Sequence, residues 1–481
     1  MSPTCPTSRD EFFWLNQISI ATLLVGLERG QFSVELALLA ARGIAKLESD
    51  AKEDASLRVK RYIDWEPKLL AITGPAVSVI HAGRSSQDIL STVRCALFRD
   101  GALETAKVLH ELIAELLNLA QTHRDTIVPS YTNGVAAQPT SLGHTFLAYA
   151  ASLLRSAQDF SQTITNFDAC AMGAMVLNGT GWALDREAMA KALGFPRPVA
   201  NAFDATCFSP VDFPLTASGH LAHVAVRLSS FINDVMTQYA TPRPWILLQE
   251  GQGKTYISSA MPQKRNPGLL NSTREEAADL LSDMMGTFAR AHNVSAGMPD
   301  GKSTSRNLAL LSDARTLFTH MKQILSALVV NEERALEELN SDWTASQEVA
   351  DRLMRLHNLP FRIGHHLASR MVSVAKKEGF APLTFPYARL TELYREVVEA
   401  EFPEAPHELP MSEAEFRSAL DPKSIVAHRA TLGSAAPAEV DRLLEDARQT
   451  LEALEAKRAA RVREIAEALC TLQERFKALQ G

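Results

Sequence analysis

Long segments with apolar residues at helical spacing constrain the fold more than any other feature of this sequence. Residues Glu104–His123 are the clearest case, because apolar side chains recur there every three or four positions with polar residues between them, as an amphipathic helix requires. Comparable segments are Ile18–Leu47, Thr140–Thr163, Thr216–Tyr239, Leu269–His292 and Leu308–Leu339. Alternating strand patterns are scarce. The sequence therefore predicts an all-α fold.

Helices of this length and apolar character need neighbours on more than one side, and the simplest arrangement is a long central helical bundle extended by oligomerisation. Pro and Gly cluster where helices are expected to stop, at Ala202–Pro214, Pro242–Pro244 and Met298–Gly301. The chain closes with a charged helical segment, Ala438–Gln480. We expect an N-terminal helical domain (residues 1–92), a central bundle that carries the functional loop (residues 93–357) and a C-terminal helical domain (residues 358–481).

Composition and charge exclude several classes of protein. The 481 residues are 46% hydrophobic and 22% charged, with a net charge of -7. These values are ordinary for a soluble globular chain and lack the basic field of a nucleic-acid-binding or membrane-surface protein. Residues Met1–Gln17 contain Asp10 and Glu11 and no apolar run, so neither a signal peptide nor a membrane span is expected there. We expect no nucleic-acid partner and no membrane association.

The cysteines point to a reducing compartment. All five are far apart in the sequence, and none forms a CxxC pair, which is typical of cytoplasmic proteins. The sequence shows no cluster of metal-ligating residues, so no metal site is expected. We therefore predict a cytoplasmic protein without a metal.

Three segments rich in small polar residues interrupt the helical pattern, and each precedes a predicted helix. The first, second and third segments are His81–Asp88 (HAGRSSQD), Tyr131–Pro139 (YTNGVAAQP) and Gly251–Pro267 (GQGKTYISSAMPQKRNP). The first can present backbone N–H groups, hydroxyls and Arg84 to an anion. One such segment is most often a helix cap, but three before long central helices indicate a functional site.

The third segment carries the most specific signal. Residues Ser258–Pro267 read SSAMPQKRNP and resemble the serine loop GSSxMPxKxNP of the fumarase/aspartase superfamily, except that Ile257 stands in place of the glycine. Both serines and the Met, Pro, Lys, Asn and Pro positions are in register. The resemblance indicates a lyase.

Within that superfamily, the chain looks most like the argininosuccinate lyase branch, as an atypical member. His81–Ser85 resembles the HTGRS segment of that branch, Ala137–Pro139 with Gly143-His144 resembles its AQP and GH stretch, and Leu359–Arg362 resembles part of its C-terminal domain. In contrast, Ser85–Ile89 (SSQDI) is similar to the TSQDI segment of the carboxymuconate cycloisomerase branch. The resemblance covers nearly the whole chain.

The resemblance implies a three-domain lyase that forms a homotetramer around a central helical bundle. Each active site would be assembled from the three segments of three different subunits. The implied reaction is an anti elimination from a substituted succinate, usually releasing fumarate, with no cofactor. The expected ligand is therefore a small dicarboxylate.

The resemblance also implies roles for individual residues. The demanding step removes a proton from the carbon beside a carboxylate, and preorganised donors and cations must meet the resulting charge. Ser258 matches the general base of the family, and Lys264 and Asn266 match residues that act on the carboxylate. The positions that match substrate-binding residues are Arg84, Ser85, Ser86, Gln87, Thr132, Asn133, Gln138, Ser259 and Met261. His81 is either a proton donor or a structural residue.

Two positions depart from the family together. Asn133 stands where most members have the His linked to the general acid, and Asn271 stands where its Glu partner lies. Loss of a general acid typically lowers the rate about 10²–10⁴-fold. A leaving hydroxide needs that proton, whereas a substituted amine is already largely cationic at pH 7. The two asparagines therefore favour C–N cleavage over C–O cleavage.

The residues expected to choose the substrate also differ. Ser295–Arg306 (SAGMPDGKSTSR) aligns with a segment in which the argininosuccinate lyase branch uses Tyr, Gln and Lys to hold the arginine part. This stretch contains neither Tyr nor Gln, so we predict that argininosuccinate is not the main substrate. Lys302 and Arg306 would suit an anionic distal group.

Three functions stay open at this point. The first is an argininosuccinate lyase-like enzyme that splits an N-substituted aspartate into fumarate and an amine, or catalyses the reverse addition. The second is a cycloisomerase acting on a muconate-like dicarboxylate, which Ser85–Ile89 favours. The third is a catalytically impaired tetrameric pseudoenzyme, and the presence of Ser258, Lys264 and Asn266 counts against it.

Overall fold

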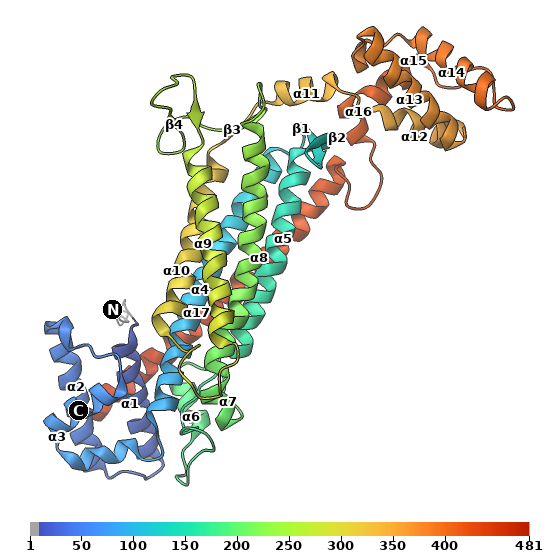
Figure 1. Ribbon diagram of the computed structural model, residues 1–481. Helices are drawn as coiled ribbons and strands as arrows, with labels where there is room; N and C mark the ends of the chain where they lie inside the picture. Colours follow the sequence, from blue (N-terminus) through green and yellow to red (C-terminus); the bar gives the residue numbers. More distant parts are fainter. Residues whose placement is uncertain (1–8, 481) are drawn as a thin grey trace.

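The molecule is elongated and mostly helical (Figure 1). The computed structural model describes residues 9–480. At its centre, long helices lie side by side in a bundle. These helices are α4 (Ser86–Thr122), α5 (Leu142–Phe167), α8 (Ser209–Gln238), α9 (Gly268–Ala291) and α10 (Thr304–Ser326). The prediction of an all-α fold with a long central helical bundle is confirmed.

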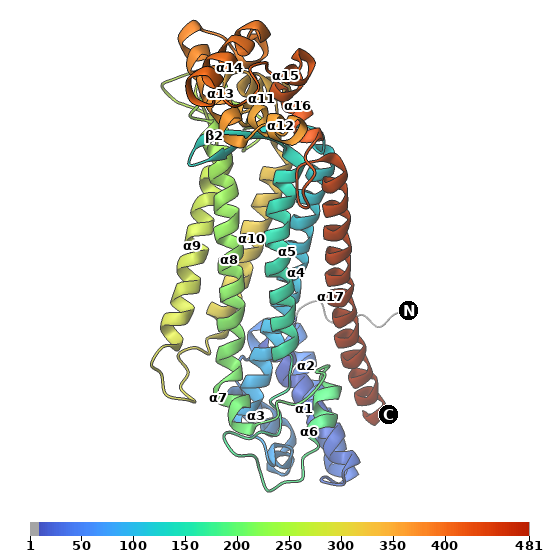
Figure 2. The same ribbon diagram turned by 90° about the vertical axis from the view of Figure 1, so that its right-hand side faces the viewer.

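Shorter helices gather at the two ends of the bundle (Figure 1). The lower end in that view carries α1 (Glu11–Glu28), α2 (Val34–Glu53), α3 (Tyr62–Thr73), α6 (Arg186–Ala192), α7 (Ala202–Cys207) and the 3-10 helices Ala55–Leu57 and Pro75–His81. The upper end carries α11 (Glu332–Ser341), α12 (Ser346–His357), α13 (Phe361–Glu378), α14 (Tyr387–Glu401), α15 (Glu413–Leu420), α16 (Pro422–Ala427) and the 3-10 helix Pro382–Thr384. The last helix, α17 (Pro437–Gln480), returns along the bundle to the lower end (Figure 2).

The strands are short and lie towards the upper end of the molecule. They form three antiparallel pairs: β1 (Ile127–Thr132) with β2 (Val135–Ser141), β3 (Ile246–Leu248) with β6 (Leu328–Val330), and β4 (Tyr256–Ile257) with β5 (Arg265–Asn266). Two of the pairs carry candidate site segments, because β1–β2 contains the second segment and β4–β5 lies within the third.

One hydrophobic core joins the lower helices, the bundle and the last helix. Trp14 of α1, Phe318 of α10 and Phe476 of α17 belong to it, and each is at most 3% exposed. A separate core, which includes Phe416, lies within the helices of the upper end. Helix α17 therefore packs on the bundle, and the upper helices bury their apolar side chains among themselves. The division into three domains stays a prediction.

Two predicted helical segments are each divided in the structure. Ile18–Leu47 contains the end of α1 and most of α2, and the break between them includes Gly30, whose φ of 69° lies in the left-handed region. Leu308–Leu339 contains most of α10, all of β6 and most of α11. Helical periodicity does not reveal such breaks, because the parts on both sides keep an apolar face.

The Pro- and Gly-rich clusters mark helix ends only in part. Pro242–Pro244 and Met298–Gly301 lie between helices, as expected. Within Ala202–Pro214, α7 ends at Cys207 but α8 already begins two residues later. Pro210 is tolerated there because it lies in the first turn of α8, where a backbone N–H has no helical partner.

No helix within residues 9–480 is long and apolar enough to cross a membrane. Cys95, Cys170, Cys207 and Cys470 form no disulfide. Residues 1–8 lie outside the described part of the chain. They include Cys5 and the beginning of Met1–Gln17, the segment in which no signal peptide is expected.

Candidate active site

The first segment, His81–Asp88, lies at the lower end of the molecule and leads into α4. Ser85 is the N-cap of that helix: its Oγ accepts a hydrogen bond from the Gln87 N–H at 3.2 Å, and its own N–H donates to the Asp88 carboxylate at 2.9 Å. These bonds satisfy N–H groups that a helix start leaves unpaired. The helix-cap interpretation is therefore correct for Ser85. Ser86 and Gln87 lie in the first turn, where the helix dipole favours an anion.

Asp88 holds a further loop against the first segment. Its carboxylate is buried, and Oδ2 accepts hydrogen bonds from the backbone N–H groups of Gly173 and Met175, each at 3.1 Å. Burial raises the pKa of Asp88 to about 6, although its backbone hydrogen bonds act in the opposite direction. The loop also packs on Gly83, where an added Cβ would lie 3.0 Å from Trp182. No pattern in the sequence predicts this contact across more than eighty residues.

Arg84 and His81 face the interior of the chain. Arg84 is 3% exposed, donates from Nη1 to the Ile80 carbonyl at 3.2 Å, and lies 5.2 Å from the centre of the Tyr62 ring. His81 stacks on the same ring with 5.0 Å between ring centres. Burial, followed by the charge of Arg84, lowers the pKa of His81. A neutral imidazole is a poor proton donor, so this geometry favours the structural role for His81.

The second segment is a β-hairpin, whereas its polar composition predicts a loop. Thr132 pairs with Val135, so Asn133 and Gly134 form a two-residue turn. Their φ angles of 53° and 76° match a type I′ turn, for which Asn-Gly is the strongest short sequence signal. Asn133 thus has a structural role, because asparagine adopts left-handed backbone more readily than most residues. Thr132, Asn133 and Gln138 are exposed on the hairpin.

Tyr131 anchors this hairpin to the upper end of the bundle. Its hydroxyl accepts hydrogen bonds from Trp245 Nε1 at 2.9 Å and from Gln238 Nε2 at 3.2 Å, and it donates to the Glu338 carboxylate. Partial burial, followed by the hydrogen bond to Glu338, raises the pKa of Tyr131 to about 12. The hydroxyl therefore stays protonated at neutral pH and holds the hairpin through three bonds.

The third segment contains a short hairpin above α9. Its turn spans residues 258–264 and is closed by the Ser258 N–H, which donates to the Lys264 carbonyl at 3.1 Å. The Ser258 Oγ accepts hydrogen bonds from the N–H groups of Ala260 at 3.4 Å and Met261 at 3.3 Å. Backbone donors in this position stabilise negative charge on the oxygen.

The tip of the third segment is exposed, and its base is tied to the protein. Ser259, Met261 and Lys264 are all exposed. At the base, Asn266 Nδ2 donates to the Tyr256 carbonyl at 3.4 Å, across the β4–β5 pair. The residues of the third segment that the sequence singles out therefore share one loop that is open to solvent at its tip.

The residues that lead into this loop have left-handed backbone conformations. Gly251, Gln252 and Gly253 have φ angles of 78°, 52° and 77°. An added Cβ on either glycine would meet no atom within 4 Å, so conformation and not space requires glycine at these positions. This stretch suits a hinge that carries the Ser258 tip.

The three segments do not meet within one chain. The first lies at the lower end of the molecule, and the second and third lie at the upper end (Figure 1). Helix α4, which starts in the first segment, has 37 residues and is therefore about 55 Å long. A small substrate cannot bridge that length. A site that contains all three segments requires residues from more than one chain.

Ser295–Arg306 lies at the lower end, far from the Ser258 tip. Lys302 is 4% exposed, and its Nζ donates to the Thr206 carbonyl at 2.8 Å. Burial lowers its pKa. The buried position of Lys302 and its bond to Thr206 do not support the hypothesis that it binds an anionic distal group, which stays a prediction. Arg306 is exposed in the first turn of α10.

Within residues 9–480, no group of three or more His, Cys, Asp or Glu side chains is placed to hold a metal ion. A cavity of ≈ 320 Å³ lies apart from the three segments, against α4, α5 and α17.

Comparison with known proteins identifies the family. A family model described as Lyase matches residues 36–281, and one described as argininosuccinate lyase C-terminal matches residues 343–427. An argininosuccinate lyase from Methanothrix thermoacetophila is 26% identical over 483 residues, which cover 97% of this chain and 94% of that protein.

Solved structures share the fold. A crystal structure of EDDS lyase in complex with formate has a TM-score of 0.85 at 24% identity, covering 98% of this chain and 92% of that one. A class II fumarase from Schistosoma mansoni has a TM-score of 0.66 at 17% identity, covering 87% and 91%. This chain belongs to the fumarase/aspartase superfamily, in its argininosuccinate lyase-like branch.

Proposed function

We propose that this protein is a carbon–nitrogen lyase that splits an N-substituted aspartate into fumarate and an amine, or catalyses the reverse addition. The observation that carries the proposal is the Ser258 Oγ, which lies beside two backbone N–H donors at the tip of an exposed loop. Ser258 acts as the general base, and Lys264 and Asn266 meet the charge that develops on the substrate carboxylate. The reaction uses no cofactor.

In this elimination, Ser258 removes the proton from the carbon beside one carboxylate. The electron pair forms the new C=C bond as the C–N bond breaks, and the amine leaves with the electrons of that bond. A serine oxygen is a weak base in water, because its conjugate partner is unfavourable at neutral pH. Closure of the loop about Gly251 and Gly253 would exclude water and strengthen the N–H and Lys264 contacts that activate Ser258.

The choice of an amine rests on Asn133 and Asn271. Asn133 is held in the hairpin turn, and Asn271 lies in the first turn of α9. Neither side chain can supply the proton that a His–Glu pair would supply. A leaving group that is already cationic, such as a substituted amine, needs no such donor, whereas hydroxide does.

The relatives support this reaction class and leave the amine open. The relative from Methanothrix thermoacetophila is an argininosuccinate lyase, and one neighbouring structure is an EDDS lyase variant with bound fumarate. We propose a substrate other than argininosuccinate, because Ser295–Arg306 lacks Tyr and Gln. Expression in a strain without argininosuccinate lyase should therefore give no growth on medium without arginine. Robust growth would contradict this choice of substrate.

We further propose that the protein is a homotetramer whose active sites each combine segments from several chains. The separation of the first segment from the third supports this, as do large apolar side chains that are exposed on the bundle helices. Val226 of α8 is 47% exposed, and Met285 and Phe288 of α9 are 64% and 43% exposed. Light scattering after size-exclusion chromatography should give four chains of 52.7 kDa. A cytoplasmic location stays a prediction.

The reaction is tested by mixing the protein with fumarate and a panel of amines and amino acids, and following the ultraviolet absorbance of fumarate. Ser258→Ala should lower turnover by at least about 10²-fold. Ser272→Ala is a matched control, since Ser272 is an exposed serine on α9 whose Oγ only donates to the Leu269 carbonyl. Wild-type turnover that survives Ser258→Ala would overturn the assigned base.

The cycloisomerase alternative is tested separately with the same protein preparation. The SSQDI sequence of Ser85–Ile89 is what favours it, so the same preparation is incubated with a carboxylated muconate. We expect no lactone. Lactone formation without any fumarate turnover would replace the C–N lyase, and inactivity towards every substrate would favour the pseudoenzyme.

A further inference from the structure

The cavity of ≈ 320 Å³ lies between α4, α5 and α17 and contains none of the residues proposed for catalysis. Its volume is within the range of about 300–1,000 Å³ that is typical of small-molecule sites. Leu103 and Ala106 of α4 and Ile164 of α5 form its apolar wall, and each is buried. The cavity could therefore hold the apolar body of a small molecule.

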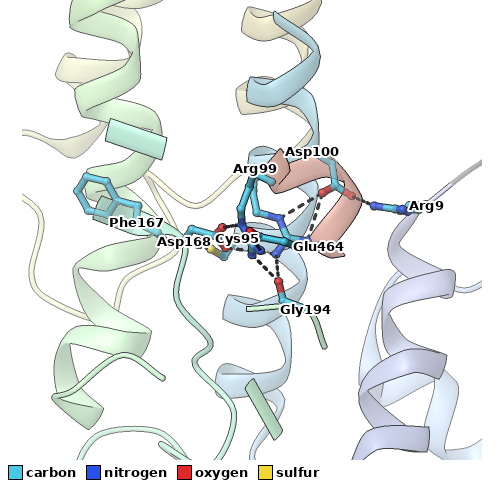
Figure 3. A network of polar contacts seen from close by, with 9 residues as sticks. Arg9, Cys95, Arg99, Asp100, Phe167, Asp168, Gly194 and Glu464 are labelled. Carbon is cyan, nitrogen blue, oxygen red and sulfur yellow. Dashed lines mark hydrogen bonds and ion pairs between the residues drawn. The ribbon is translucent and has the colours of Figure 1, made fainter. Parts of the chain in front are cut away.

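A buried ionic network (Figure 3) borders the cavity through Asp168 and Arg461. The Asp168 carboxylate accepts hydrogen bonds from Arg99 Nη1 at 3.2 Å and from Arg461 Nε at 2.5 Å, and both arginines also donate to the Gly194 carbonyl. Arg99 is fully buried, and Asp168 is 2% exposed. These ion pairs join α4 and α17 to the residue that follows α5, beside the cavity.

Most charged groups at the rim of the cavity are cationic, and the carboxylate of Glu464, which also lines it, is paired with Arg461 at 3.0 Å. Arg458 is paired with Glu455 at 2.5 Å, and Arg461 is neutralised by Asp168. Arg197 and Lys457 also line the cavity, and neither forms an ion pair with any residue between 9 and 480. Arg197 donates only to a backbone carbonyl, that of Asn166. Two positive charges are therefore left for a ligand to neutralise.

We propose that this cavity is a second ligand site, which binds a small organic anion with its apolar body against α4 and α5 and its carboxylate between Arg197 and Lys457. The ionic network explains why Arg99, Asp168 and Arg461 are present. It does not explain two unpaired cations beside an apolar cavity of ligand size. Charge-assisted hydrogen bonds to both cations would supply the orientation, and burial of the apolar body would supply much of the affinity.

Equilibrium dialysis with radiolabelled benzoate tests this site. Benzyl alcohol, which has a similar shape and no charge, and inorganic phosphate, which has no apolar body, serve as competitors. We expect saturable benzoate binding that neither competitor displaces. The double variant Arg197→Gln, Lys457→Gln should weaken binding by about tenfold or more, as expected for the loss of charge-assisted hydrogen bonds. Lys477→Gln, an exposed lysine on the same helix outside the cavity, should leave it unchanged.

A further variant separates this site from the proposed active site. Lys264→Gln removes the cation assigned to the substrate carboxylate, and it should leave benzoate binding unchanged. Loss of binding in Lys264→Gln together with full binding in the Arg197 and Lys457 double variant would overturn the proposal, as would the absence of saturable binding at millimolar benzoate. The proposal is independent of the C–N lyase reaction, because it needs no turnover.

Discussion

The first and third segments are both polar stretches that precede a bundle helix, yet they are built in opposite ways. The first is held by the buried Asp88 carboxylate and by the stack of His81 on Tyr62. The third is exposed at its tip, and the residues that lead to it, including Gly251 and Gly253, have positive φ angles. The contrast fits the proposed function, in which the first segment would be a fixed surface for the substrate and the third would be the part that closes over it.

The largest expected effect concerns the exposed segment. Lys264→Met should lower turnover by about 10²–10³-fold, the loss typical when one donor to a developing charge is removed. The melting temperature should stay unchanged, because the Lys264 side chain is exposed. Steady-state kinetics and calorimetry measure the two quantities. Lys254→Met is the matched control on the same loop, where Nζ donates only to Gln249, and its turnover should resemble that of the wild type.

In the fixed segment, Asp88→Ala should chiefly affect stability. It leaves the backbone N–H groups of Ser85, Gly173 and Met175 without their acceptor, at a cost of about 3 kcal/mol in the free energy of unfolding. Urea unfolding followed by circular dichroism measures the change. Asp64→Ala removes a partly exposed aspartate whose carboxylate pairs with Arg61 at 2.7 Å, and its effect should stay within about 1 kcal/mol. Equal shifts in both variants would mean that Asp88 does not fix the segment.

The hairpin of the second segment offers a smaller effect. Asn133→Ala places a side chain that disfavours left-handed backbone in the type I′ turn, which should cost about 1 kcal/mol of stability. Asn133→Gly should cost less, because glycine adopts that backbone freely. Thermal unfolding of the two variants tests whether Asn133 is needed for the turn conformation or only for the chemistry of its side chain. If alanine were no worse than glycine, the turn would not explain Asn133.

The smallest expected effect is the contribution of His81 to the pH dependence of stability, which acts against that of Asp88, since the raised pKa of Asp88 adds stability at lower pH. Burial lowers the pKa of His81 in the folded protein, so the unfolded chain takes up a proton first as the pH falls below about 6.5. The contribution of His81 to stability is therefore present above that pH and is lost below it. His81→Phe keeps the stack on Tyr62 and should weaken the fall in stability with acid. His407→Phe, at an exposed histidine, should not change it.

Much of the fold follows from local sequence patterns. The bundle helices show apolar residues at helical spacing because each buries one face, and the charged segment Ala438–Gln480 agrees closely with α17. The break at Gly30 and the hairpin at Asn133-Gly134 also have local signals, since both depend on left-handed backbone. Each signal consists of only one or two residues. Gly30 lies within a long segment of helical periodicity and Asn133-Gly134 within a polar segment, so the surrounding pattern dominates the prediction.

The candidate site could be predicted only in part, because its geometry depends on distant contacts. The Ser258 loop has a specific motif. No local sequence pattern predicts that Lys302 donates a hydrogen bond to the Thr206 carbonyl, almost a hundred residues away, or that the Asp88 carboxylate accepts one from Gly173. The position of the first segment at the far end from Ser258 follows from the length of α4 and its neighbours, which no short motif encodes.

The most direct test of the account is whether Ser258 of one chain works with the first segment of another. Ser258→Ala and Gln87→Ala proteins, each expected to be strongly impaired, are mixed at equal amounts, dissociated with mild denaturant and reassembled. Random assembly of sites that take these residues from different subunits should restore roughly a quarter of the wild-type turnover of fumarate with amine. Activity that stays at the level of the two parent variants would contradict the shared site.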